Sequence, residues 1–333
     1  MIDIVQVGIG PLGQKMVKSA VQRGSFRIVG AVDTDPAKVG QDLGTLCGIA
    51  PLGVKVAPGV EEALAGASAR VAVVTTVSSL KAMEAQVTLL AKAKLHIVST
   101  CEELSYPWRI QPEVAKRIDA ICKEHGVACV GTGINPGYLM DLLPTLLTTA
   151  CEDVTGIRVS RVQDASVRRI PFQQKIGAAL TVSEFEAKRE DGSLRHVGLP
   201  ESVDFIAAQL GWALDRKSES IDPVMAEEAV TTGYKPIEKG MCRGVHQVGR
   251  GFVGDDEVIT LTFTAAVGEP ASYEEVQVEG TPAFRSRIDG GIHGDIATCA
   301  VTLNTVRSAL KAGAGLKTMA DLPATSWFSQ AGS

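Results

Sequence analysis

Hydrophobic positions in the first 131 residues follow two alternating patterns. Short apolar runs rich in β-branched residues predict strands, and stretches with apolar residues every three or four positions predict helices between them. The predicted strands are Ile2–Val7, Arg27–Val32, Val71–Thr76, His96–Thr100 and Val127–Val130. Because these strands are almost continuously apolar and are separated by helices, we expect a parallel sheet covered on both faces.

The pattern changes after Asn135-Pro136-Gly137. The later strand candidates alternate more clearly between apolar and polar positions, and no obligatory helix separates them, which favours a mixed or antiparallel sheet. These candidates are Ile157–Gln163, Val245–Val253 and Val258–Ala266. Helices are predicted at Tyr138 to about Thr149, near Gln174–Ala187, near Ser202–Leu214 and at about Asp295–Ala312.

A chain of 333 residues is long enough for two domains. We therefore predict an α/β protein with a doubly wound parallel sheet in residues 1–135. Residues 136–294 are predicted to form a second, α+β domain on a mixed or antiparallel sheet, serving substrate binding and dimerisation. The C-terminal segment, 295–333, is expected to return its helix to the first domain.

A glycine motif links the first strand to the first helix. It has the spacing GxGxxG and consists of Gly8, Ile9, Gly10, Pro11, Leu12 and Gly13. Gly8 permits a tight turn, Gly10 lets the backbone approach a pyrophosphate, and Gly13 lets the helix pack closely on the strand. The free N–H groups and the positive dipole end of the helix would then face the phosphates. The motif predicts a Rossmann-type dinucleotide site.

The second strand ends at Asp33, about 20 residues after Gly13. A carboxylate there binds the ribose hydroxyls of NAD and repels the 2′-phosphate of NADP, so we expect NAD(H). Lys38 is close enough in sequence to leave NADP(H) open. Cofactor contacts are also expected where later strands end, at Thr75, Thr76 and Thr100, because ligands of such sheets bind at the carboxyl ends of strands.

Composition and charge exclude several other classes of protein. The net charge is −5 and aromatic residues make up 5% of the chain, so we expect no nucleic-acid partner. No apolar run reaches the roughly 20 residues of a membrane span, and no signal-peptide pattern precedes the first strand. The seven cysteines are scattered without a CxxC pair, which favours free thiols in the cytoplasm and no metal site.

The first candidate for chemistry is the pair Glu102 and Glu103, directly after the strand His96–Thr100. A carboxylate shielded from water there could exchange protons with a substrate beside the nicotinamide. The alternative is that both residues only cap the following turn.

Candidate substrate contacts lie beyond the last parallel strand. Asn135 is expected to bind the nicotinamide amide or the substrate, or else only to fix the turn before Pro136. Arg161 and Arg168 could hold a substrate carboxylate in two-point hydrogen bonds, the alternative being ordinary surface charges. His196 is a further substrate-pocket candidate, with a purely structural histidine as the alternative.

Five segments together carry a family resemblance. They are VGIGPLG (7–13), CEELSYPW (101–108), GTGINPGYLMD (131–141), RVQDASVRR (161–169) and HVGLPESVDFIAAQLGW (196–212). In this combination the chain resembles 2,4-diaminopentanoate dehydrogenases and related NAD(P)-dependent amine dehydrogenases of the dihydrodipicolinate-reductase-like superfamily. The resemblance extends over nearly the whole chain.

The resemblance implies reversible oxidative deamination of a small amine or a 2,4-diamino acid, with reductive amination of a ketone or aldehyde by ammonia in reverse. It further implies that the catalytic carboxylate is Glu102 or Glu103, with a slight preference for Glu102, and that the protein is a homodimer. Alternatives are an imine reductase, a carbonyl reductase and a non-catalytic NAD(H) sensor, since a fold alone does not determine activity.

Overall fold

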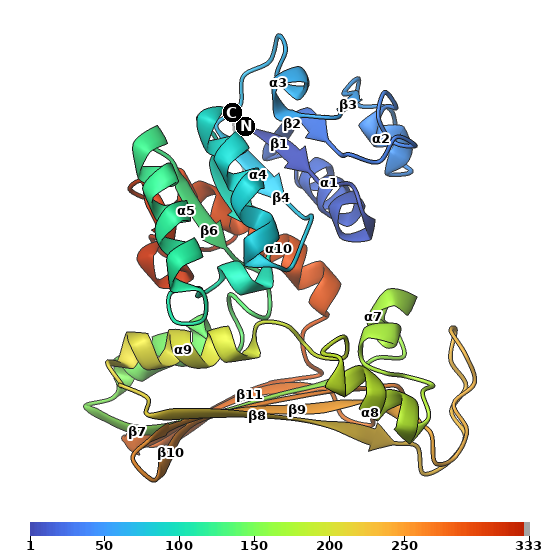
Figure 1. The fold of residues 1–333 in the computed structure, drawn as a ribbon, viewed down its shortest axis with the longest axis vertical. Helices are drawn as coiled ribbons and strands as arrows, with labels where there is room; N and C mark the ends of the chain where they lie inside the picture. Colours follow the sequence, from blue (N-terminus) through green and yellow to red (C-terminus); the bar gives the residue numbers. More distant parts are fainter. Residues whose placement is uncertain (330–333) are drawn as a thin grey trace. The chain divides into compact units, whose positions relative to one another are not determined.

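The chain folds into two compact units in a computed structural model, which describes residues 1–329 (Figure 1). The first unit contains Met1–Tyr138 together with the segment that begins at His293, and the second contains Leu139–Ile292. The first unit is thus assembled from both ends of the chain, and the second is inserted between them.

A parallel sheet of seven strands forms the centre of the first unit. Its strands are β1 (Ile2–Val7), β2 (Phe26–Val32), β3 (Val56–Ala57), β4 (Val71–Val74), β5 (His96–Ser99), β6 (Ala128–Gly131) and β13 (Gly315–Lys317). Their order is β13-β6-β5-β4-β1-β2-β3, and every neighbouring pair is parallel. The order reverses at β1 and β4, which is the point where doubly wound sheets bind ligands. The predicted Rossmann-type sheet is confirmed.

Helices cover this sheet. They are α1 (Pro11–Arg23), α2 (Leu43–Leu46), α3 (Val60–Ala63), α4 (Leu80–Lys92), α5 (Pro112–His125) and α10 (Gly294–Ala309), with 3-10 turns η1 (Glu102–Leu104) and η3 (Met319–Asp321). The C-terminal helix α10 packs against α1, where Lys15 Nζ lies 2.9 Å from Asp295 Oδ2. The chain then adds β13 to the edge of the sheet, a strand that the sequence pattern did not reveal because it has only three residues.

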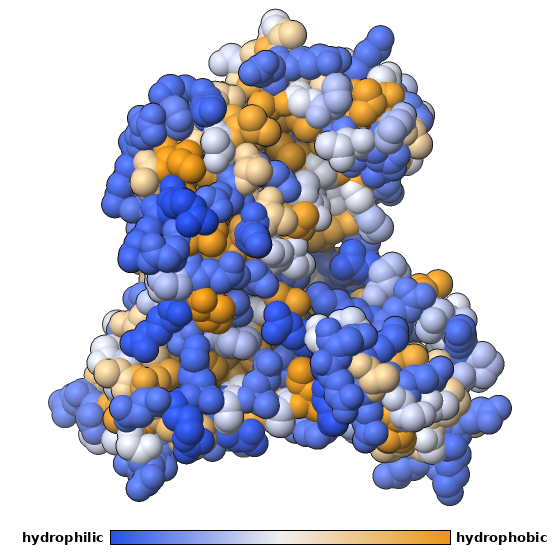
Figure 2. Space-filling model, viewed as in Figure 1, coloured by the Kyte–Doolittle hydropathy of each residue, from blue (hydrophilic) through white to orange (hydrophobic). Residues whose placement is uncertain are grey.

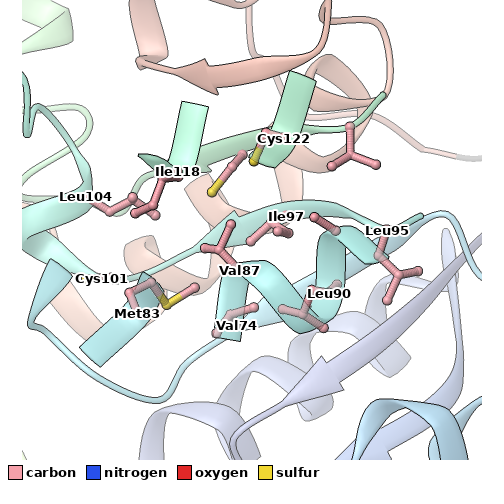
Figure 3. Close-up of a cluster of buried hydrophobic side chains, with 14 of the residues drawn as sticks. Val74, Met83, Val87, Leu90, Leu95, Ile97, Cys101, Leu104, Ile118 and Cys122 are labelled. Carbon is pink, nitrogen blue, oxygen red and sulfur yellow. The ribbon is translucent and has the colours of Figure 1, made fainter. Parts of the chain in front are cut away.

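Apolar side chains of α4 and α5 form the core of the first unit against the sheet (Figure 3). Met83 and Val87 on α4 and Ile118 on α5 are completely buried, as is Ile97 on β5. Full burial of one such aliphatic side chain stabilises the folded state by about 1.5–3 kcal/mol. The apolar spacing along α4 and α5 therefore sets which face of each helix meets the strands.

A mixed sheet of six strands forms the second unit. The strands are β7 (Asp153–Asp164), β8 (Arg216–Met225), β9 (Cys242–Val253), β10 (Asp256–Ala266), β11 (Tyr273–Thr281) and β12 (Phe284–Asp289). Their order is β12-β11-β7-β10-β9-β8; β7 and β10 are parallel, and the other neighbours are antiparallel. The predicted mixed sheet is confirmed, although β8, β11 and β12 were not among its predicted strands.

Short helices accompany the second sheet. They are α6 (Leu142–Leu147), α7 (Ile170–Lys175), α8 (Val182–Glu190) and α9 (Leu199–Leu210), with the 3-10 turn η2 (Thr148–Ala150). The single helix predicted near Gln174–Ala187 is wrong, because Gly177 adopts a left-handed φ of 75° and separates α7 from α8. The helix predicted from Tyr138 begins only at Leu142, whose N–H is capped by the Asp141 carboxylate at 2.7 Å.

The two faces of the second sheet differ in polarity. Val159 on β7, Leu261 on β10 and Val276 on β11 belong to the buried face, and α9 packs against β9 and β10. The opposite face carries polar side chains such as Ser160 and Thr262. None of the helices within residues 1–329 has both the length and the apolar character needed to cross a bilayer.

His96, at the start of β5, makes a pH-sensitive contact inside the first sheet. Its Nδ1 accepts a hydrogen bond from the N–H of Ala128 on β6 at 3.1 Å. Burial, and secondarily the charge of Arg70, lowers the pKa of His96 below its usual 6.5. The folded protein therefore favours the neutral ring, whereas the unfolded chain takes up a proton near pH 6.5.

We expect the free energy of unfolding to fall as the pH drops below about 6.5, because the unfolded chain takes up a proton at His96 there while the folded protein resists it. The variant His96→Asn offers an amide oxygen as acceptor but cannot titrate, so its stability should change less between pH 7 and pH 5. Thermal melts of both proteins over that range test this. Parallel curves for the two proteins would exclude His96 as a source of acid sensitivity.

Candidate cofactor site

The turn from β1 to α1 follows the glycine motif. Gly8 has a φ of 85°, a left-handed conformation that favours glycine. Gly10 is the N-cap residue of α1 and offers no side-chain cap, with Pro11 at the first helical position. A Cβ at Gly10 would meet no atom within 4 Å. The N-terminus of α1 is thus left open on the side where a pyrophosphate would bind.

Gly13 lies where the first turn of α1 touches the loop before it. A Cβ at Gly13 would collide with the carbonyl oxygen of Gly8 and would lie 2.9 Å from Thr75 Oγ1. Only glycine allows the helix to start this close to the strand. The structure thus shows the tight turn at Gly8 and the close packing at Gly13 that the spacing predicts, and it leaves open space at Gly10.

Asp33 lies at the end of β2 and contacts the glycine loop directly. Its Oδ2 accepts a hydrogen bond from the N–H of Ile9 at 2.7 Å and lies 3.2 Å from Lys38 Nζ, and its Oδ1 accepts from the N–H of Asp35 at 2.9 Å. Burial raises the pKa of Asp33, but these two N–H groups and Lys38 outweigh it and hold that pKa below its usual value. Asp33 is therefore ionised at neutral pH.

A pocket of about 480 Å³ opens beside these residues. Five of the predicted cofactor residues line it: Gly8, Gly10, Asp33, Thr75 and Thr76. The other predicted cofactor contacts do not line this pocket: Ile9, Pro11, Leu12 and Gly13 continue the glycine loop into α1, Thr100 follows β5, and Asn135 follows β6. Figure 2 shows hydrophobic residues gathered where Figure 1 places β1, β2 and α4, the elements that border this pocket.

Sequence reasoning missed part of the pocket wall. Val60, at the start of α3, and Leu89, on α4, add apolar surface, and Gln86 contributes an amide that accepts from Thr76 Oγ1 at 2.7 Å. Leu89 is 60% exposed, but single exposed apolar residues are common on protein surfaces, so neither Leu89 nor Val60 carries a sequence signal that could have identified it.

Glu102 and Glu103 follow β5, at the same edge of the sheet as the ends of β1 and β4. Glu103 Oε2 accepts hydrogen bonds from the N–H of Leu80, the first residue of α4, at 2.9 Å and from Gln111 Nε2 at 2.7 Å. Glu103 therefore caps the N-terminus of α4, a helix that precedes it in the chain. The sequence alternative, in which it caps only the following turn, did not include this contact. Glu102 is half-buried and begins η1, and its carbonyl oxygen accepts from Ser105 Oγ at 2.7 Å.

Asn135 belongs to the first unit, in the loop that follows β6. Its side chain is half-buried, and its peptide bond to Pro136 is cis. Gly137 follows with a φ of 118°, so this loop reverses sharply.

The second unit gathers Arg161 and Arg168 around Gln163. Arg161 is only 2% exposed; its Nη1 lies 3.6 Å from Glu274 Oε1, and its Nη2 donates to the carbonyl of Ile292 at 3.3 Å. Arg168 Nη1 donates to Gln163 Oε1 at 2.8 Å. Burial lowers the pKa of Arg161 to about 10, so the group is still charged at neutral pH. Arg161 is thus a buried cation and not an ordinary surface charge.

His196 belongs to the same group of side chains. Burial, followed by the charges of Lys175, Arg161 and Arg168, lowers the pKa of His196 to about 3, so the ring is neutral at pH 7. Its backbone is held by Gln247, which accepts from the His196 N–H at 2.8 Å and donates to the His196 carbonyl at 3.1 Å. The structure thus brings Arg161, Arg168 and His196 together within the second unit.

Among residues 1–329 no three His, Cys, Asp or Glu side chains are arranged to hold a metal ion. The part of the chain that the structure describes instead offers a glycine loop, an ionised Asp33 and a partly apolar pocket. These features fit a dinucleotide.

Two family models match the chain. Residues 138–331 match the 2,4-diaminopentanoate dehydrogenase C-terminal domain. Residues 2–103 match the N-terminus of dihydrodipicolinate reductase, which agrees with the fold of the first unit.

Individual proteins extend these matches over the whole chain. The 2,4-diaminopentanoate dehydrogenase of Acetoanaerobium sticklandii is 30% identical over 335 residues, which cover 97% of this chain and 93% of that protein. An amine dehydrogenase of Streptomyces virginiae is 26% identical over 238 residues, covering 70% of this chain and 66% of the other.

Among solved structures, that of an amine dehydrogenase from Mycobacterium smegmatis shares the fold. Its TM-score is 0.86 at 23% identity, with 98% of this chain and 97% of the other covered. The domain match at residues 138–331 and the near-complete alignment with the A. sticklandii enzyme identify the family of the chain, which a shared fold alone would not do. The chain belongs to the 2,4-diaminopentanoate dehydrogenase family.

Proposed function

We propose that this protein is an NAD(P)-dependent amine dehydrogenase that carries out the reversible oxidative deamination of a small amine or a 2,4-diamino acid. The observation that carries the proposal is the position of two adjacent glutamates at the carboxyl edge of the dinucleotide-binding sheet. Glu103 accepts a hydrogen bond from the N–H of Leu80 and caps α4, and Glu102 begins η1 next to it. We assign the structural role to Glu103 and the catalytic role to Glu102. The named relatives, a 2,4-diaminopentanoate dehydrogenase and amine dehydrogenases, support the same reaction class.

The residues present fit a nicotinamide dinucleotide. Gly8, Gly10 and the open N-terminus of α1 would hold the pyrophosphate, and Asp33 would bind the adenosine ribose. When bound, the nicotinamide supplies the hydride acceptor or donor. We further propose that Asn135 hydrogen-bonds the nicotinamide amide or the substrate.

In the deamination direction the amine carbon loses a hydride and becomes an iminium carbon. Glu102 would first remove a proton from the substrate ammonium and release it to solvent, so that the carboxylate is ionised again when the hydride leaves and stabilises the positive iminium. It would then take a proton from water as that water attacks the iminium carbon, and return it to the nitrogen as the adduct collapses to ketone and ammonium. The balance is substrate ammonium, oxidised cofactor and water giving ketone, ammonium, reduced cofactor and one released proton.

The cationic group of the second unit is our candidate for the polar end of the substrate. Arg161 lies 3.6 Å from Glu274, Arg168 donates a hydrogen bond to Gln163, and the neutral ring of His196 lies near both arginines. Such a group favours a carboxylate ligand. It therefore supports an amino acid substrate over a simple amine.

Replacing the two glutamates separately tests the proposed division of labour. We expect Glu102→Gln to lower kcat by about 10²–10⁴, the usual contribution of a general acid–base, without weakening NADH binding. Glu103→Gln keeps an oxygen for the Leu80 N–H but loses its charge at a helix N-terminus, so we expect about 0.5–1 kcal/mol less stability. Its kcat should change far less than that of Glu102→Gln. The reverse ranking of kcat would transfer the catalytic role to Glu103.

The reaction class is tested by reductive amination. NADH consumption is measured with 2-amino-4-oxopentanoate and with a simple ketone, each with and without ammonium. We expect turnover only with ammonium, and faster turnover with the carboxylate-bearing compound if Arg161 and Arg168 hold it. Turnover without ammonium would indicate a carbonyl reductase. NADH binding with no turnover of either compound would favour an imine reductase or a sensor.

Cofactor preference is expected to depend on Asp33 and Lys38. The ionised Asp33 repels a 2′-phosphate, while Lys38, 3.2 Å away, provides a positive charge at the same point of the pocket. We expect tighter binding of NADH than of NADPH. Lys38→Met should raise the Kd of NADPH about fivefold and the Kd of NADH much less, since one charge contact of about 1 kcal/mol is removed at a partly exposed site. Equal increases in titrations with both cofactors would contradict this assignment.

Assembly and location complete the proposal. We propose a homodimer on the strength of the family resemblance, and the particle mass in solution, measured against the chain's 35.0 kDa, tests it. The seven cysteines are free, which supports a reducing compartment such as the cytoplasm. Cell fractionation would test the location.

A further inference from the structure

Gln6 is a buried polar residue in the middle of an apolar strand. Its side chain is 1% exposed, while Ile4 and Val5 beside it on β1 are completely buried. Burial of an amide is unfavourable unless its hydrogen bonds are made, and an aliphatic residue would suit this strand better. The use of glutamine here therefore calls for a specific contact.

That contact is the carbonyl oxygen of Gly8, in the cofactor loop. Gln6 Nε2 lies 2.9 Å from this oxygen and 2.9 Å from Thr75 Oγ1, and Thr75 Oγ1 lies 2.9 Å from the same Gly8 oxygen. The donors and acceptors match. One amide N–H and the threonine hydroxyl satisfy the two lone pairs of the carbonyl, and the second amide N–H reaches the threonine oxygen.

The other end of the same peptide unit is also held. The N–H of Ile9, which follows the Gly8 carbonyl, donates to Asp33 Oδ2 at 2.7 Å. Gly13 packs so closely on the Gly8 oxygen that no Cβ fits between them. The Gly8–Ile9 peptide plane therefore has its oxygen turned into the protein and its N–H turned toward Asp33.

We propose that Gln6, acting with Thr75, is a positioning residue for the pyrophosphate of the dinucleotide. A peptide plane that rotated would turn the negative end of a carbonyl dipole toward the phosphates, beside the N-terminus of α1. Gln6 and Thr75 hold the Gly8 carbonyl from behind the loop and so prevent this rotation. Thr75 lines the pocket, whereas Gln6 does not. The inference concerns dinucleotide binding alone and is independent of the amine chemistry.

The experiment compares two probes by calorimetric titration of the full chain. ADP-ribose carries the pyrophosphate, and adenosine does not. In Gln6→Met, which keeps the length of the side chain but removes its N–H groups, we expect the Kd of ADP-ribose to rise about tenfold, equivalent to 1.4 kcal/mol. The Kd of adenosine should change less than twofold, because Asp33 is also held by Asp35 and Lys38, which Gln6 does not touch.

Thr75 supplies a matched pair of variants and a test that does not depend on the folding of Gln6→Met. Thr75→Val keeps the shape but loses the hydroxyl that donates to the Gly8 carbonyl, so it should weaken ADP-ribose selectively. Thr75→Ser retains the hydroxyl and should bind ADP-ribose as the parent does. An unchanged Kd for ADP-ribose in Gln6→Met and Thr75→Val would overturn the proposal. Equal weakening of both probes would also overturn it, since that result indicates general loosening of the unit.

Discussion

The hydrogen bond between the Ile9 N–H and the Asp33 carboxylate joins the two strands whose ends make the cofactor pocket. β1 supplies the glycine loop and β2 supplies the carboxylate, and this 2.7 Å contact fixes the loop beside the carboxylate that we propose binds the ribose. The N–H groups of Asp35 and Ile9, with Lys38, hold the pKa of Asp33 below its usual value against the effect of burial. The charge of the pocket therefore depends on backbone donors as well as on side chains.

Much of the first unit follows from local sequence signals. Apolar runs predicted β1, β2, β4, β5 and β6, and the spacing of Gly8, Gly10 and Gly13 predicted the loop, because each of these depends on residues close together in the chain. The strands β3 and β13 are too short to produce a pattern and are held by pairing with distant partners. Glu103 caps Leu80, a residue 23 positions away in the chain, so no local sequence rule could have distinguished the role of Glu103 from that of Glu102.

The second unit was harder to predict because its polar residues are buried. Gln163, Gln247 and Glu274 interrupt strands with charges or amides that usually indicate exposure, yet each is buried and hydrogen-bonded or ion-paired. They surround Arg161 and His196, two candidates that sequence reasoning named without knowing that they lie together. Burying these polar groups costs desolvation free energy, and the result is a cation held at a fixed position in the second unit.

The assembly of the first unit from both chain ends has a consequence for biosynthesis. A ribosome delivers β1 to β6 early, but α10 and β13 emerge only after the whole of Leu139–Ile292 has been made. Until then β6 is an uncovered edge of the nascent sheet, with a row of unpaired backbone groups. The cofactor-binding unit begins to form first and is completed last, so a chain that stops before residue 293 leaves an open sheet edge exposed to association with other chains.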